Sequence, residues 1–455
     1  MDGLYAVGVD GACRDPRLAR CIYQAFAADL VSCVIRAGSC YIRIRLARES
    51  LRVRDHRQGP CLERQRLEEL RGVYRDGLLD DVLPFWTRHA VDREHGGFMT
   101  ALDRDGSLLD TDKSMWQQGR FSWLLGKLYN CVETRPQWLE LCRHGIEFLD
   151  AHAVDPADGR MWFQVTREGR PIRKRRYAFT EAFSAIAHGE YAKASGDARA
   201  ADAARQAFAA FTAQFLQPAG EPKYTEERPT RSFGFPMICM VTAQELRESI
   251  LFEEADAWID RSIEMIERFH VKPEHRCVME TVGIDGEILD HFDGRTLNPG
   301  HAIEGAWFMM REGRHRGDAG LVDLGCRMLD WMWERGWDAE HGGIFYFRDL
   351  DGKPVQDYWH DMKFWWPQSE AITATLMAYR LTGETRHADR HRQIHDWAHA
   401  RFPDADHGEW FGYLHRDGRL SVGLKGNLWK GPFHVPRMQL VCWQLIEELL
   451  QADPG

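Results

Sequence analysis

One pattern recurs along this chain of 455 residues and limits the folds that it can adopt. An acidic turn with glycine precedes about five β-prone residues, and a second turn ends in glycine, which is typical of a short two-stranded ribbon. The clearest copies are DREHGGFMTALDRDG from Asp92, DPADGRMWFQVTREG from Asp155, DAEHGGIFYFRDLDG from Asp338 and DADHGEWFGYLHRDG from Asp404. EHRCVMETVGIDG from Glu274 is a weaker copy, and GEPKYTEERPT from Gly220 takes the place of a sixth. A repeat of this kind predicts an architecture of equivalent units.

Helices are predicted between the ribbons, because apolar residues recur there at helical spacing. Amphipathic helices are expected at Gln65–Arg88, Gln137–Ala153, Ala198–Phe215, Ala255–Phe269, Asp318–Glu334 and Arg386–His399. A ribbon follows each of them, and then a more uniformly apolar helix begins near Lys113, Phe179, Gly234, Gly300, Met362 or His434. A helix that is apolar on all sides must be buried. The pairs therefore predict an all-α (α/α)6 barrel, with an inner ring of helices inside an outer ring. An open α-solenoid is the alternative, although it would bury the inner helices less completely.

The first 62 residues differ from the rest of the chain. They hold five of the eleven cysteines and ten arginines, but no lysine and no tryptophan. No signal-peptide cleavage pattern follows their apolar patch. We expect residues 1–62 to be a poorly ordered extension that forms no domain, translated from a start codon placed too early, rather than a targeting segment. Residues 63–455 are expected to form the barrel domain.

Composition narrows the class of protein. The net charge of −10 argues against a general nucleic-acid binder. No apolar run reaches the roughly 18 uncharged residues that a membrane span needs. The cysteines include no CxxC pair, which favours reduced cytoplasmic thiols over a disulfide framework or a structural zinc site. We therefore expect a cytoplasmic protein with neither a nucleic-acid nor a membrane partner.

Unusual polar and aromatic residues gather near the starts of the inner helices. They are Arg120, His301, Glu304, Lys363, Trp366, Glu370, Trp429, His434 and Arg437. In a closed barrel these residues would converge at one end of the axis, although they are far apart in sequence. The positive ends of the helix dipoles would favour anionic oxygen there.

Two histidines at equivalent places in different repeats favour a catalytic pair. A single buried histidine is more often structural, but His301 and His434 are each followed three residues later by a charged residue. Glu304 would orient His301 and raise its basicity. Glu370 has a structural alternative, a buried ion pair with Lys363 or Arg120. The tryptophans are either core residues or flat walls on which sugars stack.

Other chemistries have weaker support. A metal site from His301, Glu304 and His434 is conceivable, but no HExxH motif or dense Cys/His spacing accompanies it, and we expect no metal. No nucleotide-binding loop and no GxSxG motif occurs in the chain. A glycosidase with paired carboxylates remains open on an (α/α)6 barrel, with the histidines incidental.

The motifs KSMWQQGRFSW, REGRPIRKRRYAFTEAF, NPGHAIEGAWF, GWDAEHGGIFYF, MKFWWPQSEA and GEWFGYLHRDG…KGPFHVPR together resemble the N-acylglucosamine 2-epimerase family, which includes the renin-binding proteins. The resemblance runs from about Arg64 to about Leu450. It implies an (α/α)6 barrel. The site residues that it implies are the catalytic His301 and His434, the essential Arg120, the glutamates Glu304 and Glu370, and the stacking Trp366 and Trp429. Lys363 and Arg437 are added as expected substrate-binding residues.

Related cellobiose 2-epimerases and mannose or sulfosugar isomerases carry a third histidine just before the glutamate of the second inner helix. This chain has RRYAFTEAF at that place, without a histidine. The departure favours the N-acylglucosamine branch, and Glu181 is expected to be structural.

The resemblance implies an isomerase that interconverts N-acetylglucosamine and N-acetylmannosamine at carbon 2 of the open-chain sugar. One histidine would remove the proton and the other would return it to the opposite face, while Arg120 would hold the oxyanion. Glu370 would hold sugar hydroxyls. No cofactor is expected for the chemistry. ATP as a non-consumed activator and a homodimer rest on the resemblance alone. An aldose–ketose isomerase or a cellobiose or mannose 2-epimerase on the same scaffold is the alternative, and a purely protein-binding, renin-binding-like module is a weaker one.

Overall fold

The computed structural model describes residues 32–37, 40–45, 62–175, 177–216, 225 and 227–452. The chain divides into two compact units, Met1–Gln58 and Gly59–Gly455. In the first unit, β1 (Ser32–Ala37) and β2 (Cys40–Arg45) pair as an antiparallel hairpin. The expectation that residues 1–62 form no domain falls for the most part outside the described residues, as does most of the ribbon predicted from Gly220.

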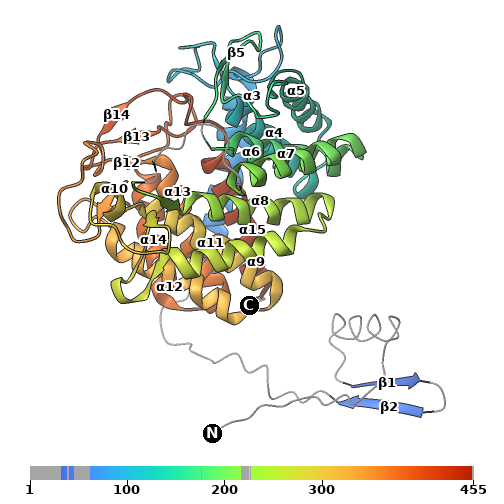
Figure 1. The fold of residues 1–455 in the computed structure, drawn as a ribbon, viewed down its shortest axis with the longest axis vertical. Coiled ribbons are helices and arrows are strands. Elements are labelled where there is room, and N and C mark those ends of the chain that lie inside the picture. Colours follow the sequence, from blue (N-terminus) through green and yellow to red (C-terminus); the bar gives the residue numbers. More distant parts are fainter. Residues whose placement is uncertain are drawn as a thin grey trace. The chain divides into compact units, whose positions relative to one another are not determined.

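The second unit consists of helix pairs arranged in two rings (Figure 1). The outer ring contains α2 (Arg64–Asp76) with η2 (Gly77–Val82) and α3 (Leu83–His89), α5 (Pro136–His152), α7 (Ala198–Leu216), α9 (Ala255–Met265) with η3 (Ile266–His270), α12 (Ala319–Gly336) and α14 (Thr385–His399). The inner ring contains α4 (Met115–Cys131), α6 (Phe179–Ser195), α8 (Gly234–Ile250), α11 (Pro299–Arg316), α13 (Trp365–Thr382) and α15 (His434–Ala452). The predicted (α/α)6 architecture is confirmed.

Burial separates the two rings as the sequence pattern requires. Every residue of α13 from Trp365 to Tyr379 is buried, whereas α5 buries only one stripe of its surface. An inner helix has neighbours on all sides, so apolar residues all round its circumference are stabilising. Within the described part of the chain, no helix combines the length and the apolar character that a bilayer crossing requires.

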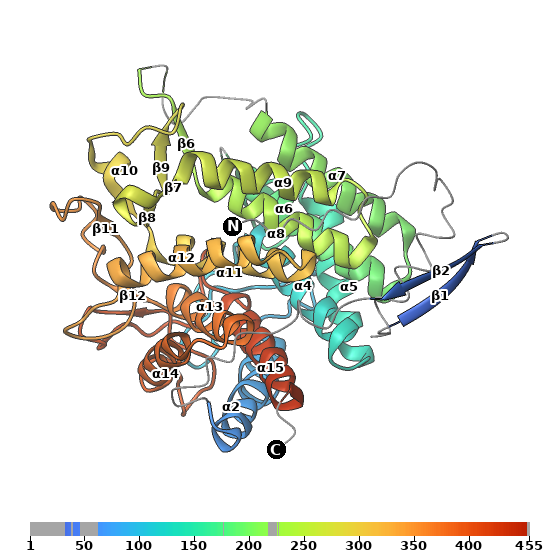
Figure 2. The ribbon, with the colours of Figure 1, turned by 90° about the horizontal axis from the view of Figure 1, so that it is seen from below.

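The ring of helices is closed. Figure 2 shows α2 and α15, from the two ends of the barrel sequence, side by side, and they pack against each other. The Phe433 ring, just before α15, lies 5.4 Å from the Trp123 ring of α4. Gln444 of α15 also donates a hydrogen bond to the Cys131 sulfur of α4 at 3.5 Å. The last repeat therefore contacts the first, as in a closed barrel and unlike an open solenoid.

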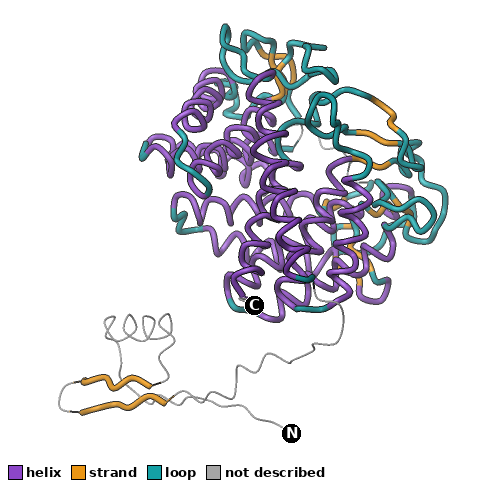
Figure 3. Tube along the Cα trace, turned by 180° about the vertical axis from the view of Figure 1, so that it is seen from behind, coloured by secondary structure: helices purple, strands orange, loops and turns teal. Residues whose placement is uncertain are grey.

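Short antiparallel strands connect the outer helices to the inner ones. Two equivalent three-stranded sheets are formed by β3 (Lys113–Ser114), β4 (Gln164–Val165) and β5 (Pro171–Arg173), and by β12 (Lys363–Phe364), β13 (Tyr413–Leu414) and β14 (Leu420–Val422). The remaining strand pairs of the barrel are β6 (Thr230–Ser232) with β9 (Thr281–Gly283), β7 (Val271–Lys272) with β8 (Cys277–Val278), and β10 (Thr296–Leu297) with β11 (Arg348–Asp349). Two short helices interrupt this part of the chain, η4 (Pro273–His275) after β7 and α10 (Phe292–Arg295) before β10. Figure 3 shows the strands and long loops of the second unit gathered on one side of its helices. Because every ribbon leads into an inner helix, the starts of the inner helices lie at this end.

The acidic residue that opens three of the ribbons explains why the motif repeats. Each carboxylate accepts hydrogen bonds from a buried lysine and from an arginine of a neighbouring ribbon. The three sets are Asp92 with Lys113 and Arg167, Asp338 with Lys363 and Arg416, and Asp404 with Lys425 and Arg104. A buried charge is tolerated when it is paired in this way. The third set joins the last ribbon to the first and so helps to close the ring.

Lys363, which the sequence analysis expected to bind substrate, instead belongs to one of these ion-pair sets. Its side chain is fully buried, and its ammonium group lies 3.2 Å from both Asp338 and the carbonyl oxygen of Gly343. Burial lowers the pKa of Lys363 to about 8, although Asp338 opposes the shift. The expected role of Lys363 in substrate binding is corrected to a structural one, because its donors are committed to the ribbon turn.

Candidate active site

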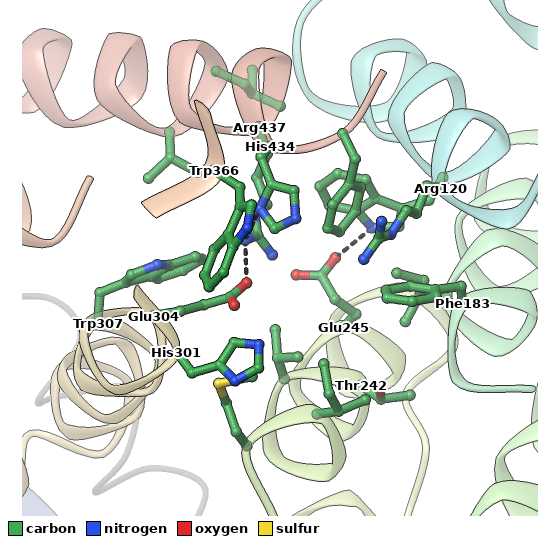
Figure 4. Close-up of a pocket in the computed structure, with 18 of the residues that line it drawn as sticks. Arg120, Phe183, Thr242, Glu245, His301, Glu304, Trp307, Trp366, His434 and Arg437 are labelled. Carbon is green, nitrogen blue, oxygen red and sulfur yellow. Dashed lines mark hydrogen bonds and ion pairs between the residues drawn. The ribbon is translucent and has the colours of Figure 1, made fainter. Parts of the chain in front are cut away.

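A cavity of about 730 Å³ opens among the inner helices. Most of the predicted site residues line it, namely Arg120, His301, Glu304, Trp366, Trp429, His434 and Arg437. Glu370 lies behind His434 rather than on the cavity wall. Figure 4 shows the rings of His301 and His434 on opposite sides of the open space. The closed ring thus brings together side chains from four different repeats.

Local structure explains the position of His301. Helix α11 begins with Pro299, which suits the first helical turn, and the Asn298 side chain caps it by accepting a hydrogen bond from the His301 amide at 3.2 Å. Gly300 is needed for close approach, since a Cβ atom there would lie 2.5 Å from the Trp366 ring. The sequence NPGHAIEGAWF therefore places His301 in the first turn of α11, beside Trp366.

Glu280 orients His301. Both carboxylate oxygens of Glu280 lie 3.1 Å from Nδ1 of His301. Burial disfavours the charged imidazolium, but the nearby carboxylates, Glu280 first and then Glu304 and Glu370, raise the pKa of His301 above its usual value. The sequence analysis gave this orienting part to Glu304, which is corrected here because Glu304 bonds elsewhere. Glu280 belongs to the weak ribbon copy, and no helical spacing links it to His301.

Glu370 orients the second histidine. Its Oε1 atom lies 2.7 Å from Nδ1 of His434 and 2.7 Å from the Arg437 guanidinium, and its Oε2 atom accepts from Trp307 at 2.8 Å. Since a carboxylate only accepts hydrogen bonds, Nδ1 of His434 carries the proton and Nε2 is left as the basic nitrogen. Both oxygens of Glu370 are engaged, so the expected contact with sugar hydroxyls is corrected to a positioning role.

Burial holds His434 neutral. It lowers the pKa of His434 well below the usual value, and the nearby Arg437 adds to this effect while Glu304 opposes it. The pKa values of the two histidines are therefore shifted in opposite directions, although each has a carboxylate at Nδ1. Environments that move two pKa values apart are a common way to separate an acid from a base.

Arg437 is shared between two buried carboxylates. It donates to Glu370 and to Glu304, and only 5% of its surface is exposed. Nη2 makes both bonds, and Arg437 also lines the cavity, so its expected role in substrate binding stays a prediction. Glu304, Glu370 and His434 together offer donor atoms within 4.8 Å of one another, a group able to hold a metal ion. The Arg437 guanidinium already takes the place of a cation between the two carboxylates of this group, so the donor set fits a metal cation poorly.

Arg120 is a buried cation surrounded by aromatic rings. Its guanidinium lies 4.2 Å from the Phe183 ring centre and 4.7 Å from that of Phe433. Burial lowers the pKa of Arg120 to about 9, and Glu304 opposes the shift. Among the residues that the structure describes, no carboxylate forms an ion pair with Arg120, and its buried Nε has no partner. Unpaired guanidinium donors at a cavity suit a developing oxyanion.

Aromatic walls border the two histidines. The Trp366 ring lies 5.1 Å from the ring of His301 and 5.8 Å from that of His434. Trp429 remains 41% exposed, with its ring 5.4 Å from that of Phe163. Flat apolar faces beside polar groups are typical of carbohydrate sites.

A charged cluster deeper in the cavity was not anticipated from the sequence. Glu245 accepts hydrogen bonds from Trp123 at 2.9 Å, Lys127 at 3.0 Å and Arg311 at 2.7 Å. Arg120 and Glu245 are both visible in Figure 4. These residues come from α4, α8 and α11, and only the closed ring brings them together.

Outside the cavity, Glu181 accepts from Arg160 at 2.6 Å and so ties α6 to its ribbon, as expected of a structural residue.

Comparison with known proteins shows which family this chain is similar to. A family model described as N-acylglucosamine 2-epimerase (GlcNAc 2-epimerase) matches residues 96–434. The N-acylglucosamine 2-epimerases of Bos taurus and Homo sapiens are 38% and 35% identical over 82% of this chain, with 90% and 89% of their own lengths covered. The cellobiose 2-epimerase of Spirochaeta thermophila has a similar fold, with a TM-score of 0.73 at 22% identity, over 86% of this chain and 100% of that one.

Proposed function

This chain belongs to the N-acylglucosamine 2-epimerase family, and we propose that it interconverts N-acetylglucosamine and N-acetylmannosamine by inverting carbon 2. One observation carries the proposal. Two histidines from different inner helices face one cavity, and each is held at Nδ1 by its own carboxylate. Such a pair is suited to moving a proton on one side of a bound molecule and returning it on the other.

The reaction begins with ring opening, because the hydrogen on carbon 2 becomes acidic only beside the free aldehyde. In one direction the neutral His434 removes this proton through Nε2, and the resulting anion is enediolate-like. The protonated His301 then delivers a proton to the opposite face of carbon 2. In the reverse direction the two histidines exchange roles. The opposite pKa shifts of His301 and His434 support this division of labour.

Arg120 holds the negative charge that develops on the aldehyde oxygen. Its guanidinium is buried, cationic and without a carboxylate partner among the described residues, so its donors remain for substrate. Glu304 binds a sugar hydroxyl through the oxygen that Arg437 does not engage. Trp366 and Trp429 stack on the sugar, while Glu370, Arg437 and Glu280 position the histidines.

The acetamido group fits a two-base site. When carbon 2 carries a hydroxyl, the intermediate can collapse to a ketose, and one base then suffices. An acetamido nitrogen does not readily allow this collapse, so the proton must return to carbon 2. Relatives named N-acylglucosamine 2-epimerases, 35% and 38% identical to this chain, support this substrate over cellobiose or free mannose.

The proposed reaction needs no metal or redox cofactor, because histidines move the protons and Arg120 holds the charge. Prolonged dialysis against EDTA should therefore leave activity unchanged. An effect of ATP would be that of a non-consumed activator, since no phosphoryl group is transferred. We propose a cytoplasmic homodimer, and the free state of the cysteines in the described residues supports a reducing compartment.

A sugar panel in D₂O tests the proposed function. We expect proton NMR to show inversion and deuterium exchange at carbon 2 for N-acetylglucosamine and N-acetylmannosamine, and slow turnover of cellobiose and mannose. Rapid conversion of mannose to fructose would identify an aldose–ketose isomerase instead. Inversion of cellobiose alone would identify a disaccharide epimerase, and no reaction with any sugar would favour a binding protein.

A further inference from the structure

The two histidine–carboxylate pairs differ in how the carboxylate is neutralised. Glu370 bonds His434, but it also accepts from Arg437 and from Trp307. Its negative charge is therefore partly offset by a guanidinium, which it shares with Glu304. In the part of the chain that the structure describes, the Glu280 carboxylate has hydrogen bonds only with His301. At His301 the carboxylate charge is shared with no other hydrogen-bond donor of the described residues, so it is available to stabilise an imidazolium.

The backbone fixes Glu280 in place from the ribbon beside α8. The Glu280 carbonyl oxygen accepts a hydrogen bond from the Phe233 amide at 2.9 Å, just before α8 begins. The next residue, Thr281, pairs with Ser232 in the β6–β9 sheet. These two backbone contacts fix the position from which the Glu280 side chain reaches His301. The contact is therefore a built feature of the ribbon and not an incidental surface pair.

The other ionisable groups that face His301 have partners of their own. Glu304 lies one turn further along α11 and bonds Arg437. Glu370 of α13 bonds the same arginine, and His434 of α15 is buried and neutral. Glu304 and Glu370 also favour a charged His301, but less strongly than Glu280, and they share the Arg437 guanidinium. Glu280 is thus the principal group that distinguishes His301 from His434.

We propose that Glu280 is the positioning residue that keeps His301 protonated, so that the free enzyme rests with an imidazolium at position 301 and a neutral imidazole at position 434. This inference rests on the proposed function and deepens it. The resting form can react with only one of the two epimers. After that reaction His434 holds the proton from carbon 2 and His301 is neutral. One proton must then leave His434 and one must return to His301, with no net change, before the next turnover.

The pH dependence of the reaction tests this role. We expect Glu280→Gln to move the alkaline limb of kcat/KM to lower pH in the direction in which His301 donates. We also expect kcat/KM to fall about 10- to 100-fold, the range found for carboxylates that orient metal-bound histidines. Glu280→Asp should restore the limb in part, because it keeps the charge. Glu274→Gln is the matched control, since Glu274 is an exposed glutamate of the same ribbon.

The protonation state is also measured directly, without activity. Imidazole signals are followed by NMR as pH is raised and assigned with His301→Asn. We expect His301 to titrate above the ordinary value of about 6.5, and to lose this elevation in Glu280→Gln but not in Glu274→Gln. An unchanged His301 titration in Glu280→Gln overturns the inference. If the elevation is present but no N-acetyl sugar reacts, the proposed function fails while the charge state assigned to His301 stands.

Discussion

Arg120 is a buried cation whose neighbours are aromatic rings. A cation between Trp116 and Trp123 in an apolar helix is unexpected, and the sequence alone left an ion pair with Glu370 open. The structure instead surrounds the guanidinium with the rings of Phe183 and Phe433. Aromatic faces compensate part of the cost of burying the charge, and they leave its hydrogen-bond donors free for another partner.

Replacing Arg120 with lysine should abolish most activity, although the positive charge is kept. A planar fork stacked between rings is not reproduced by an ammonium group on a flexible stem. We expect kcat/KM to fall by about 10²- to 10³-fold, as when an oxyanion donor is lost. The melting temperature measured alongside should change little. Near-normal turnover in Arg120→Lys would assign the residue to the structure alone.

The partners of the site glutamates could not be predicted from the sequence. His301, His434 and Arg120 are recognisable because a histidine or arginine is unusual at the start of an apolar helix. The partner of each charge is set by distances across the ring, which no helical spacing encodes. Glu304 was therefore paired with the nearest histidine in sequence, whereas it bonds Arg437, and Glu280 was overlooked. The roles of all these residues in the reaction stay predictions.

At the scale of elements, the long periodic segments were the most predictable. All the helix pairs appear close to their predicted positions, because burial of one stripe or of a whole helix leaves a clear pattern in about 15 residues. Lys363 was misassigned because a lysine that closes a ribbon turn and one that binds substrate look alike in sequence. Only the fully buried pair with Asp338 separates the two possibilities.

Lys363→Met should destabilise the barrel without a specific effect on substrate binding. Removal of the lysine leaves the buried Asp338 carboxylate without one of its two cations, the other being Arg416. We expect a loss of about 3–5 kcal/mol in urea unfolding, as for other broken buried pairs. The double variant Lys363→Met, Asp338→Asn should recover part of this loss. A raised KM at unchanged stability would return Lys363 to the substrate site.

Helix α14 carries a column of four histidines on its inward face. His387, His391, His395 and His399 recur every four residues on one face and lie buried or nearly so, with His395 Nδ1 2.7 Å from the Tyr74 hydroxyl of α2. Burial lowers the pKa of His391 to about 3 and that of His387 and His399 to about 4. The pKa of His395 is lowered as well.

The barrel should therefore lose stability as pH falls below about 6.5, where histidines of the unfolded chain begin to bind protons. In the folded state these histidines stay neutral until far lower pH, so the unfolded state binds more protons and gains free energy. Each such group contributes about 1.4 kcal/mol per pH unit within this window. We expect urea midpoints to fall steadily from pH 7 to pH 4.5, and less steeply in His391→Gln. Identical pH slopes in the two proteins would contradict the account.

At the scale of the whole molecule, closure of the ring is what creates the site. The ion pair of Arg104 with Asp404 and the packing of α15 on α2 join the first and last repeats. His301 and His434 belong to repeats separated by α13. In an open array of repeats, their side chains would not lie opposite each other across a cavity. Closure was predicted from the burial that the inner helices require, but the contacts that achieve it were not, because they join residues about 300 positions apart.

The central claim is that His301 and His434 act on opposite faces of carbon 2, and deuterium exchange in single variants tests it directly. Each of His301→Asn and His434→Asn should lose net epimerisation by at least the 10²- to 10⁴-fold that one acid–base group contributes. The remaining histidine can still remove a proton and return deuterium to the same face. Starting from each pure sugar in D₂O, we expect proton NMR to show each variant labelling a different epimer without inverting it. Labelling of the same epimer by both variants, or full epimerisation by either, would contradict the two-base account.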